Sequence, residues 1–477
     1  MKTLKKIING ILVVVLLLSM AGCASGEENV SESKESGGFQ VGYGEADITP
    51  EESIPLQGSG NVLASMSNGF EERLSVCCFV VKDEKGEMAM IIVYDLCVMG
   101  DSNITSIRSD VSKDTGVKKE NIIVSTTHNH GGPDITEIGV AAISRYLSHL
   151  YDRTVDAAVA AVEDLAPAEM MTTSVQTENL TFVRRYVLEN GTYAGSNYGH
   201  FGSAPIKEHE AGLDEEMQLI KFVREDKDDI ILTNFQAHAA SILPTNSASA
   251  DFVGIYRNTV SEKLGCHVLY IQGASGNLNP MSKIESENVA KNYIEHGKLL
   301  AEYTIKAEGS YKKANTGDVK IKSVTYAAEI NHAYDALVAE ATQIRNYWRS
   351  SGNKTKADEM CEGTDISSAN HAQAICAIAA FGAKIDTQLT VLSIGNTAFA
   401  TAPFELFGQL GLMIKEKSPY DMTFVMAYTN GSYGYLPSED VWDHRGYEVD
   451  VCKLPKGGGE ALVGQLINML DQMKSGK

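Results

Sequence analysis

Basic residues are scarce in this 477-residue chain. Lysine and arginine number 41, against 62 aspartates and glutamates, so the formal net charge is −21 at pH 7. A surface this acidic repels phosphate groups, which argues against nucleic acid as a partner and against electrostatic adhesion to anionic lipid. The composition leaves protein partners open.

Cysteine and linker-like sequence are also sparse. None of the eight cysteines forms a C-x-x-C pair, and Cys77, Cys78 and Cys97 lie in apolar runs. This pattern predicts buried free thiols rather than a disulfide framework or a cysteine metal cluster. The chain has no internal repeat and no second linker rich in Ser, Pro and Gly beyond the polar segment near its amino terminus. We therefore expect one large domain over residues 40–477.

The amino terminus has the three parts of an export signal. Lysines precede the apolar run Ile11–Leu18, which is too short for a membrane-spanning helix, and small residues follow. The ending L-S-M-A-G-C resembles a bacterial lipobox, in which Cys23 becomes the lipidated first residue; an ordinary cleaved signal is the alternative. We predict a lipoprotein signal peptide over residues 1–22 and a flexible tether over 23–39. The protein would be exported and lipid-anchored to the outer face of a bacterial membrane.

Hydrophobic periodicity predicts both strands and helices. Strands are expected at Leu74–Val81, Met88–Tyr94, Asn121–Thr127, Met217–Val223, Ile230–Gln236, His267–Gln272, Leu389–Gly395 and Thr397–Ala402. Helices are expected at Ala141–Leu165, Phe252–Leu264, Glu287–Ala307, Asp335–Arg349, Ala372–Phe381 and Glu460–Lys474. Because these elements do not follow a strict βαβ alternation, the predicted fold class is α/β (α+β), with mixed β-sheets packed together and flanked by helices.

The segment Val124–Asp134, V-S-T-T-H-N-H-G-G-P-D, carries the first candidate site. A β-branched run leads into His128 and His130. Side chains at i and i+2 of an extended segment share a face, so we expect both imidazoles on one side of a sheet end. Imidazole is a common zinc ligand and titrates near neutral pH. A surface loop with two incidental histidines is the alternative.

Further short motifs follow in order along the chain. They are V-G-Y-G-E-A-D-I-T-P from Val41, a predicted strand ending at His238, S-A-D-F-V-G around Asp251, Q-G-A-S-G-N-L-N-P from Gln272, A-P-F-E-L around Glu405, and N-G-S-Y-G-Y-L-P around Tyr435. Together with the H-x-H segment they resemble the amino-terminal catalytic domain of the neutral/alkaline, non-lysosomal ceramidase family. The resemblance covers essentially the whole expected domain and makes residues 40–477 a ceramidase-like catalytic domain.

The resemblance implies one zinc ion per chain, held by His128, His238, Glu405 and Tyr435, whereas Tyr433 is offset from the pattern. Taken singly, these residues have ordinary alternatives: a strand-end histidine, a helix-start carboxylate and a core aromatic. Nitrogen and oxygen donors suit zinc, which generates hydroxide at neutral pH and polarises a carbonyl. An amide also needs oxyanion stabilisation and a proton for the departing amine.

The resemblance implies that His130 stabilises the oxyanion or transfers the proton. It also implies that Asp251 supports the metal ligands from behind; Asp251 could instead serve only as the cap of the following helix. The chain departs from the family at Asn279, which stands where characterised ceramidases carry a catalytic Ser. Asn can donate a hydrogen bond to an oxyanion but cannot be acylated, so a metal-hydroxide route is expected. Ser275 in the same turn does not match the pattern and is expected to be structural.

Two further departures leave the substrate open. The family's immunoglobulin-like domain is not seen after the last expected helix, and the helical segment 333–384 could cover the site. Arg184 and Arg185 resemble a family segment that could bind a polar or anionic substrate group, with a solvated strand end as the alternative. We expect cleavage of an N-acyl amide in ceramide or a related lipid. The same metal site acting on another amide or ester of a glycan, peptide or lipid, or a non-catalytic surface binding lipoprotein, are the alternatives.

Overall fold

The computed structural model describes residues 38–57, 66–136, 139–195, 204–242 and 246–476. The predicted signal peptide, Cys23 and the tether up to residue 37 lie outside these residues. The chain divides after Ser36 into two units, and the second, Gly37–Lys477, contains the helices and strands of the described residues.

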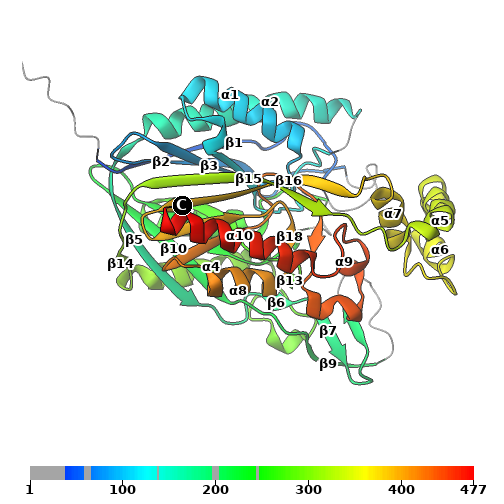
Figure 1. The fold of residues 1–477 in the computed structure, drawn as a ribbon. Helices are drawn as coiled ribbons and strands as arrows, with labels where there is room; N and C mark the ends of the chain where they lie inside the picture. Colours follow the sequence, from blue (N-terminus) through cyan, green and yellow to red (C-terminus); the bar gives the residue numbers. More distant parts are fainter. Residues whose placement is uncertain (1–37, 58–65, 137–138, 196–203, 243–245, 477) are drawn as a thin grey trace, which may run out of the picture. The chain divides into compact units, whose positions relative to one another are not determined.

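A nine-stranded mixed sheet contains most of the predicted strands (Figure 1). Its members, in spatial order, are β12 (His267–Gln272), β11 (Ile230–Phe235), β10 (Glu216–Arg224), β5 (Ala166–Gln176), β1 (Gln40–Asp47), β2 (Ser75–Lys82), β3 (Met88–Tyr94) and β4 (Ile122–Thr126), with β14 (Lys312–Lys313) beside β5. The pairs β3–β4 and β11–β12 are parallel and the others are antiparallel. The predicted mixed sheet is confirmed.

This sheet folds back on itself. β1 and β5 pair at only two positions, and beyond that junction the two halves face each other. Phe79 of β2 and Phe222 of β10 meet with ring centroids 5.0 Å apart, and β12 contacts β2, β3 and β4. Because of this folding, the ends of β4 and β11 approach each other although the strands lie far apart in the strand order.

A second sheet packs against the first. It consists of β15 (Val319–Glu329), β16 (Lys384–Ile394), β17 (Thr397–Thr401) and β19 (Met422–Met426). Leu392, Phe399 and Phe424 of this sheet share a buried cluster with both halves of the first. Small two- and three-stranded sheets lie around the strand ends: β13 (Leu278–Asn279) with β6 (Phe182–Val183), β18 (Glu405–Leu406) with β20 (Tyr435–Leu436), and β7 (Arg185–Leu188) between β8 (Tyr193–Gly195) and β9 (Ile206–His209).

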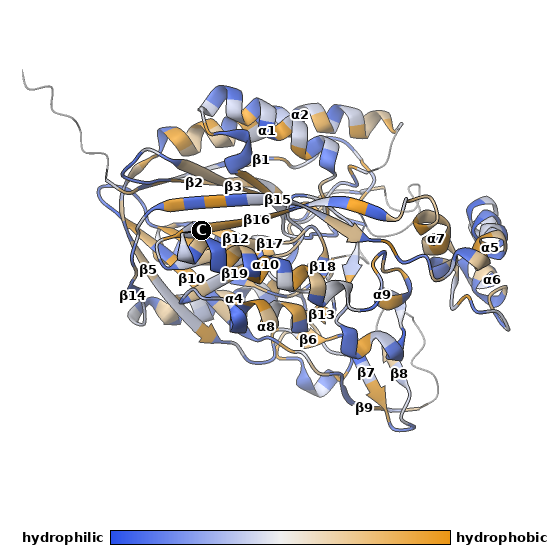
Figure 2. Cartoon of the chain, viewed as in Figure 1, coloured by the Kyte–Doolittle hydropathy of each residue, from blue (hydrophilic) through white to orange (hydrophobic). Residues whose placement is uncertain are grey.

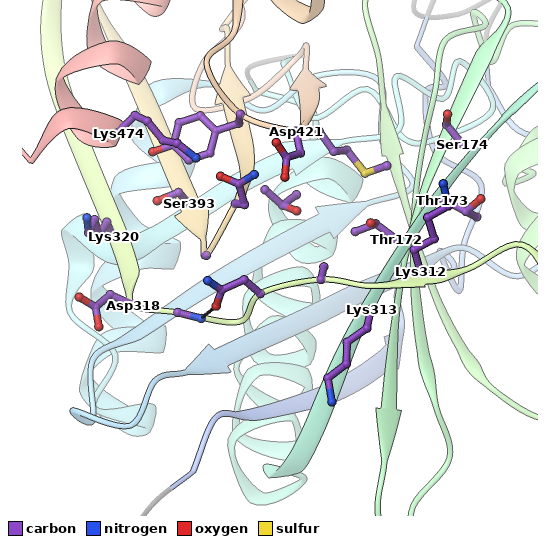
Figure 3. Close-up of a pocket in the computed structure, with 18 of the residues that line it drawn as sticks. Thr172, Thr173, Ser174, Lys312, Lys313, Asp318, Lys320, Ser393, Asp421 and Lys474 are labelled. Atoms are coloured by element: carbon purple, nitrogen blue, oxygen red, sulfur yellow. Dashed lines mark hydrogen bonds between the residues drawn. The ribbon is translucent and has the colours of Figure 1, made fainter.

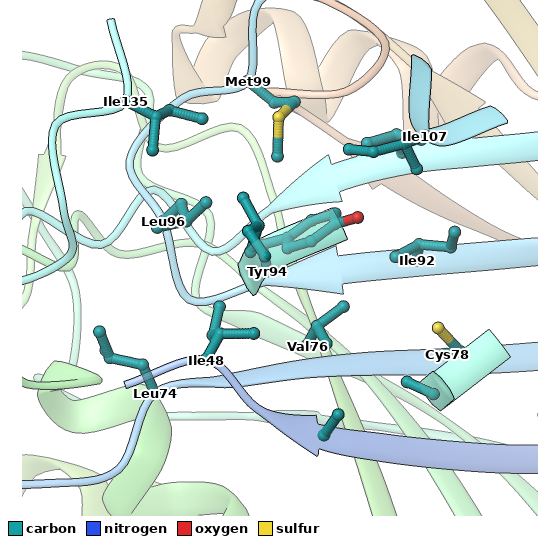
Figure 4. Packing of buried hydrophobic residues seen from close by; sticks show 14 of the residues in the cluster. Ile48, Leu74, Val76, Cys78, Ile92, Tyr94, Leu96, Met99, Ile107 and Ile135 are labelled. Carbon is teal, nitrogen blue, oxygen red and sulfur yellow. The ribbon is translucent and has the colours of Figure 1, made fainter. Parts of the chain in front are cut away.

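Helices flank the sheets. They are α1 (Asp101–Thr115), α2 (Ala141–Glu163), α3 (Asp251–Leu264), α4 (Tyr293–Lys306), α5 (Val338–Ser351), α6 (Lys354–Glu359), α7 (Ala369–Ile378), α8 (Gly408–Lys417), α9 (Tyr447–Asp450) and α10 (Gly458–Ser475). In one half of the first sheet, Val76 and Cys78 pack against α1 and α2 (Figure 4). α3 and α4 cover the other half, and α8 and α10 cover the second sheet. Helices α1 and α2 carry both hydrophilic and hydrophobic residues, as one-sided burial requires (Figure 2).

Cysteines of the described residues are free, and Cys77, Cys78 and Cys97 are buried, as predicted. The predicted hairpin at Gly395 joins β16 to β17 with a left-handed φ of 56°. Among the described residues, we find no helix with the length and apolarity needed to cross a membrane. The helices of the predicted cover, α5 to α7, share a small core of their own, and α7 contacts α9.

Close packing of α2 on β1 generates the first prediction. A Cβ at Gly44 would lie 2.1 Å from the carbonyl oxygen of Ala157 and 2.7 Å from the nitrogen of Ala161. Gly44→Ala should therefore lower the free energy of unfolding by about 1–3 kcal/mol or more, measured as a shift of the urea midpoint. Gly464→Ala is the matched control, because Gly464 faces open space on α10. That change should be neutral or raise stability by up to about 1 kcal/mol. Equal midpoints for both variants would contradict this account of the packing.

Candidate metal centre

His128 and His130 lie together just beyond the end of β4. The predicted extended geometry is wrong, because β4 ends at Thr126 and His128 has a left-handed φ of 56°. The imidazoles nevertheless meet, with ring centroids 4.8 Å apart at 89° and Nε2 atoms 3.2 Å apart. A turn after the strand, rather than strand alternation, places them side by side.

His238 follows β11 and faces His128. The Nε2 atoms of the two rings are 3.0 Å apart. His128 Nδ1 lies 3.0 Å from the carbonyl oxygen of Cys97, and His238 Nδ1 lies 3.2 Å from that of Ser275. A carbonyl can only accept a hydrogen bond, so each Nδ1 carries the proton and each Nε2 keeps a lone pair. Two lone pairs therefore face each other.

Glu405 completes this group of acceptors. Its Oε2 lies 3.1 Å from His128 Nε2 and 3.9 Å from His238 Nε2. The same oxygen is buried and receives no hydrogen bond. The ligating atoms of the three residues all lie within 4.8 Å of one another. Three acceptors with no proton between them repel one another unless a cation joins them, so this donor set fits a divalent metal ion.

Tyr435 lies beside Glu405 through strand pairing. β18 and β20 run parallel, and Glu405 is the register partner of Tyr435. Burial raises the pKa of Tyr435 well above its usual value, with the nearby Glu405 as the second cause. Tyr433 points elsewhere, because its hydroxyl donates to Asp101 at 2.7 Å.

Cys97 is a neighbour that sequence reasoning did not place at the site. Its Sγ lies 3.6 Å from His128 Nδ1 and 3.7 Å from His130 Nε2. Together the three residues form a second group with metal-ligand geometry. Burial raises the pKa of the Cys97 thiol well above its ordinary value. The only signal in the sequence is a cysteine three residues after a strand, which does not identify its partners.

Arg184 and Arg185 are buried in an ion network. Each side chain is 3% exposed, so the alternative of a solvated strand end is wrong. Arg184 Nε lies 2.9 Å from Glu448, its Nη1 lies 3.4 Å from Asn279 Oδ1, and its guanidinium sits 5.4 Å from the Tyr435 ring centroid. Arg185 instead turns to Glu210 at 2.6 Å. The structure thus brings Arg184 and Asn279 to the candidate centre and directs Arg185 away from it.

Asp251 anchors the backbone next to the site. Its carboxylate accepts the N–H of Ile242 at 3.0 Å and that of Phe252 at 2.6 Å. It is fully buried at the start of α3 and is not among the grouped ligand atoms. It therefore ties the segment after His238 to the helix.

A large hollow lies elsewhere in the described part of the chain. It has a volume of about 1040 Å³ and is lined by β5, β14, the β16–β17 turn and the end of α10, including Thr172, Lys312, Lys320, Asp421 and Lys474 (Figure 3). A second hollow of about 220 Å³ includes Arg185, His444 and Arg445. None of the predicted metal ligands lines either hollow.

The burial of Asp251 predicts a pH dependence of stability. Desolvation raises its pKa from 3.8 to about 6, so between these values the folded state holds a proton that the unfolded chain has lost. The free energy of unfolding contributed by this group therefore falls as pH rises from about 4 to about 6. Asp251→Asn should remove that decline, measured by urea unfolding at pH 5 and pH 7. A decline of the same size in the variant would contradict the assignment.

Comparisons with known proteins identify the family of this chain. The family model described as neutral/alkaline non-lysosomal ceramidase, N-terminal, matches residues 39–294. The chain is 27% identical to a neutral ceramidase of Drosophila melanogaster over 234 residues, which are 45% of this chain and 31% of that protein. It is 31% identical to a neutral ceramidase of Drosophila pseudoobscura pseudoobscura over 102 residues, 20% of this chain and 14% of that protein. The matched region thus spans about a third or less of these relatives.

The fold has a counterpart among solved structures. The crystal structure of neutral ceramidase from Pseudomonas aeruginosa superposes with a TM-score of 0.69 at 16% identity, covering 92% of this chain and 75% of that one. A ceramidase complexed with C2 gives the same values. At this identity the likeness concerns the fold, and it agrees with the mixed sheets and flanking helices of this chain. With the family model matching more than half of its length, the chain belongs to the neutral/alkaline, non-lysosomal ceramidase family.

Proposed function

We propose that this protein is a zinc-dependent hydrolase that cleaves an N-acyl amide bond, in ceramide or a related N-acyl lipid, through a metal-activated water. One observation carries the proposal: two imidazole Nε2 atoms and a buried carboxylate oxygen that receives no hydrogen bond converge on one point. His128, His238 and Glu405 would hold the ion. Tyr435, the register partner of Glu405, is the proposed fourth ligand. When bound, zinc lowers the pKa of a coordinated water from about 15.7 toward about 7 and polarises the substrate carbonyl.

The chain's own residues supply the rest of the chemistry. His130 lies beside the ligands and would stabilise the oxyanion or deliver the proton that the departing amine needs. Asn279 has an amide that can donate to the oxyanion, and Arg184 contacts the oxygen of that amide. This contact directs the Asn279 nitrogen away from Arg184. Asp251 would act through the backbone that it anchors after His238, and Arg185 through the Glu448 carboxylate that it shares with Arg184.

Asn279 also bears on the choice of substrate. An amide side chain cannot form an acyl-enzyme, which excludes a covalent route at this position, whereas a water activated at the metal would still serve as the nucleophile. The family membership and the neutral ceramidases among the relatives support a lipid amide. The departure at Asn279 favours one second candidate, the same metal site acting on another amide or an ester.

Metal content and activity test the function together. The purified protein should contain about one zinc per chain by elemental analysis, because the candidate ligands form one site that would keep a coordination position for water. It should release fatty acid from a panel of N-acyl lipids. Chelation, His128→Ala and Glu405→Gln should each abolish the release, because each removes a ligand or the ion. His332→Ala, at a surface histidine paired with Asp335, is the matched control and should behave as wild type.

The outcomes separate the candidates. Bound zinc without release from any lipid amide would move the assignment to a different amide or ester. A protein that carries no metal and is unaffected by His128→Ala would instead be a binding lipoprotein.

We further propose that the protein is lipid-anchored at the outer face of a bacterial membrane through Cys23. The lysines, apolar run and lipobox-like ending of residues 1–23 support this location. Cys23→Ser should move the full-length protein from the detergent phase to the aqueous phase on Triton X-114 partition. It should also abolish incorporation of labelled fatty acid. An unchanged detergent-phase fraction would refute the anchor.

A further inference from the structure

The segment after β19 lies between the ends of β4 and β12. The N–H of Ala427 donates to the carbonyl oxygen of Gln272 at 3.2 Å, and that of Asn430 donates to the carbonyl oxygen of Val124 at 2.8 Å. Between them, Tyr428 has a left-handed φ of 55°. Bulky residues rarely adopt this conformation, which persists only where the surroundings fix it.

Tyr428 contacts His128 directly and forms hydrogen bonds with residues that adjoin the other two candidate ligands, His238 and Glu405. Its ring stacks on the imidazole of His128 with centroids 3.9 Å apart and planes at 21°. Its hydroxyl lies 2.8 Å from Ser275 Oγ in a buried hydrogen bond. Its backbone N–H donates at 3.2 Å to the carbonyl oxygen of Phe404, the residue before Glu405.

Ser275 connects Tyr428 to the other imidazole. Its carbonyl oxygen faces His238 Nδ1 at 3.2 Å. Its Oγ accepts from Gln272 Nε2 at 2.7 Å, and the same nitrogen donates at 2.6 Å to the carbonyl oxygen of Ala237, the residue before His238. Ser275 and Gln272 are fully buried, so water does not replace these bonds.

From these contacts we propose that Tyr428 and Ser275 form a clamp that orients His128 and His238 toward a common metal ion. The proposal rests on the metal centre of the proposed function and deepens it. His128 follows β4 and His238 follows β11. The Tyr428 ring stacks on His128, and the Ser275 carbonyl oxygen faces His238 Nδ1. The hydrogen bond between the Tyr428 and Ser275 side chains therefore links the supports of the two imidazoles. Residues that orient metal-bound histidines typically contribute about 10- to 100-fold to metal affinity.

A structural role alone makes a different prediction. If Tyr428 only fills the core, removing its hydroxyl lowers stability and leaves metal affinity and ligand geometry unchanged. If it orients the imidazoles, the same change weakens the metal site and alters its spectrum. Metal affinity and the spectrum of a substituted ion therefore distinguish the two roles without any measurement of activity.

The test uses the full chain with Tyr428→Phe, Ser275→Ala and the double variant. Tyr428→Phe keeps the ring on His128 and removes only the hydroxyl. Zinc affinity is measured by competition with a chromophoric chelator, and ligand geometry by the visible absorption of the cobalt(II)-substituted protein. Tyr256→Phe is the matched control, because Tyr256 is equally buried and its hydroxyl bonds Thr233 at 2.6 Å and Thr304 at 2.8 Å.

Each single variant should weaken zinc binding about 10-fold or more and shift the cobalt spectrum. The double variant should be no weaker than Ser275→Ala alone, because both changes remove the same hydrogen bond. Tyr256→Phe should lose stability while keeping wild-type affinity and spectrum. Wild-type affinity and spectrum in Tyr428→Phe would overturn the clamp and leave the metal centre intact, whereas a wild-type protein that binds no zinc would overturn both.

Discussion

The candidate metal centre depends on the ends of β4 and β11 lying close together, although these strands are far apart in the strand order of the sheet. β4 and β11 belong to opposite halves of a folded sheet, and the segment Ala427–Asn430 is hydrogen-bonded into the space between β4 and β12. His128 follows the end of β4 and His238 follows the end of β11, and their Nε2 atoms lie 3.0 Å apart. Polar groups gathered at strand ends can carry chemistry because the sheet behind them is rigid. The fold alone thus sets the distance between the two imidazoles, without a bound ion.

Backbone strain is concentrated in the same region. His128, Asp251, Tyr428 and Asn430 all have positive φ, a conformation that costs of order 1–3 kcal/mol in residues other than glycine. The packing there is also close, because a Cβ at Gly276 would lie 2.3 Å from the carbonyl oxygen of Glu405. The surrounding hydrogen bonds must outweigh these costs, which explains why buried side chains such as Asn430 donate and accept on several sides. The strained residues thus lie where the exact position of the side chains around the candidate ligands outweighs the cost to folding stability.

Much of this could be read from the sequence, for identifiable reasons. Strands such as Met88–Tyr94 and His267–Gln272 were predicted at their observed bounds because they are continuous apolar runs buried on both faces. β5 and β15 were missed because many of their residues are exposed or half-exposed, so their composition is mixed. The candidate ligands were found because short motifs carry them. Cys97 and Tyr428 were not, because their contacts with His128 span 31 and 300 residues of sequence and follow no period.

A network of buried charged side chains lies beside the candidate centre and holds Arg184 and Arg185 in fixed positions. Arg184 and Arg185 share the Glu448 carboxylate, and Arg185 also pairs with Glu210. A buried ion pair seldom adds net stability, because desolvation offsets the attraction, but removing one partner leaves an uncompensated charge. The two arginines and two glutamates balance one another, so the network adds little net charge next to Glu405. Glu405 is the carboxylate that approaches both imidazoles, with Oε2 3.1 Å from His128 Nε2 and 3.9 Å from His238 Nε2, and a divalent cation held by the three residues would offset its charge.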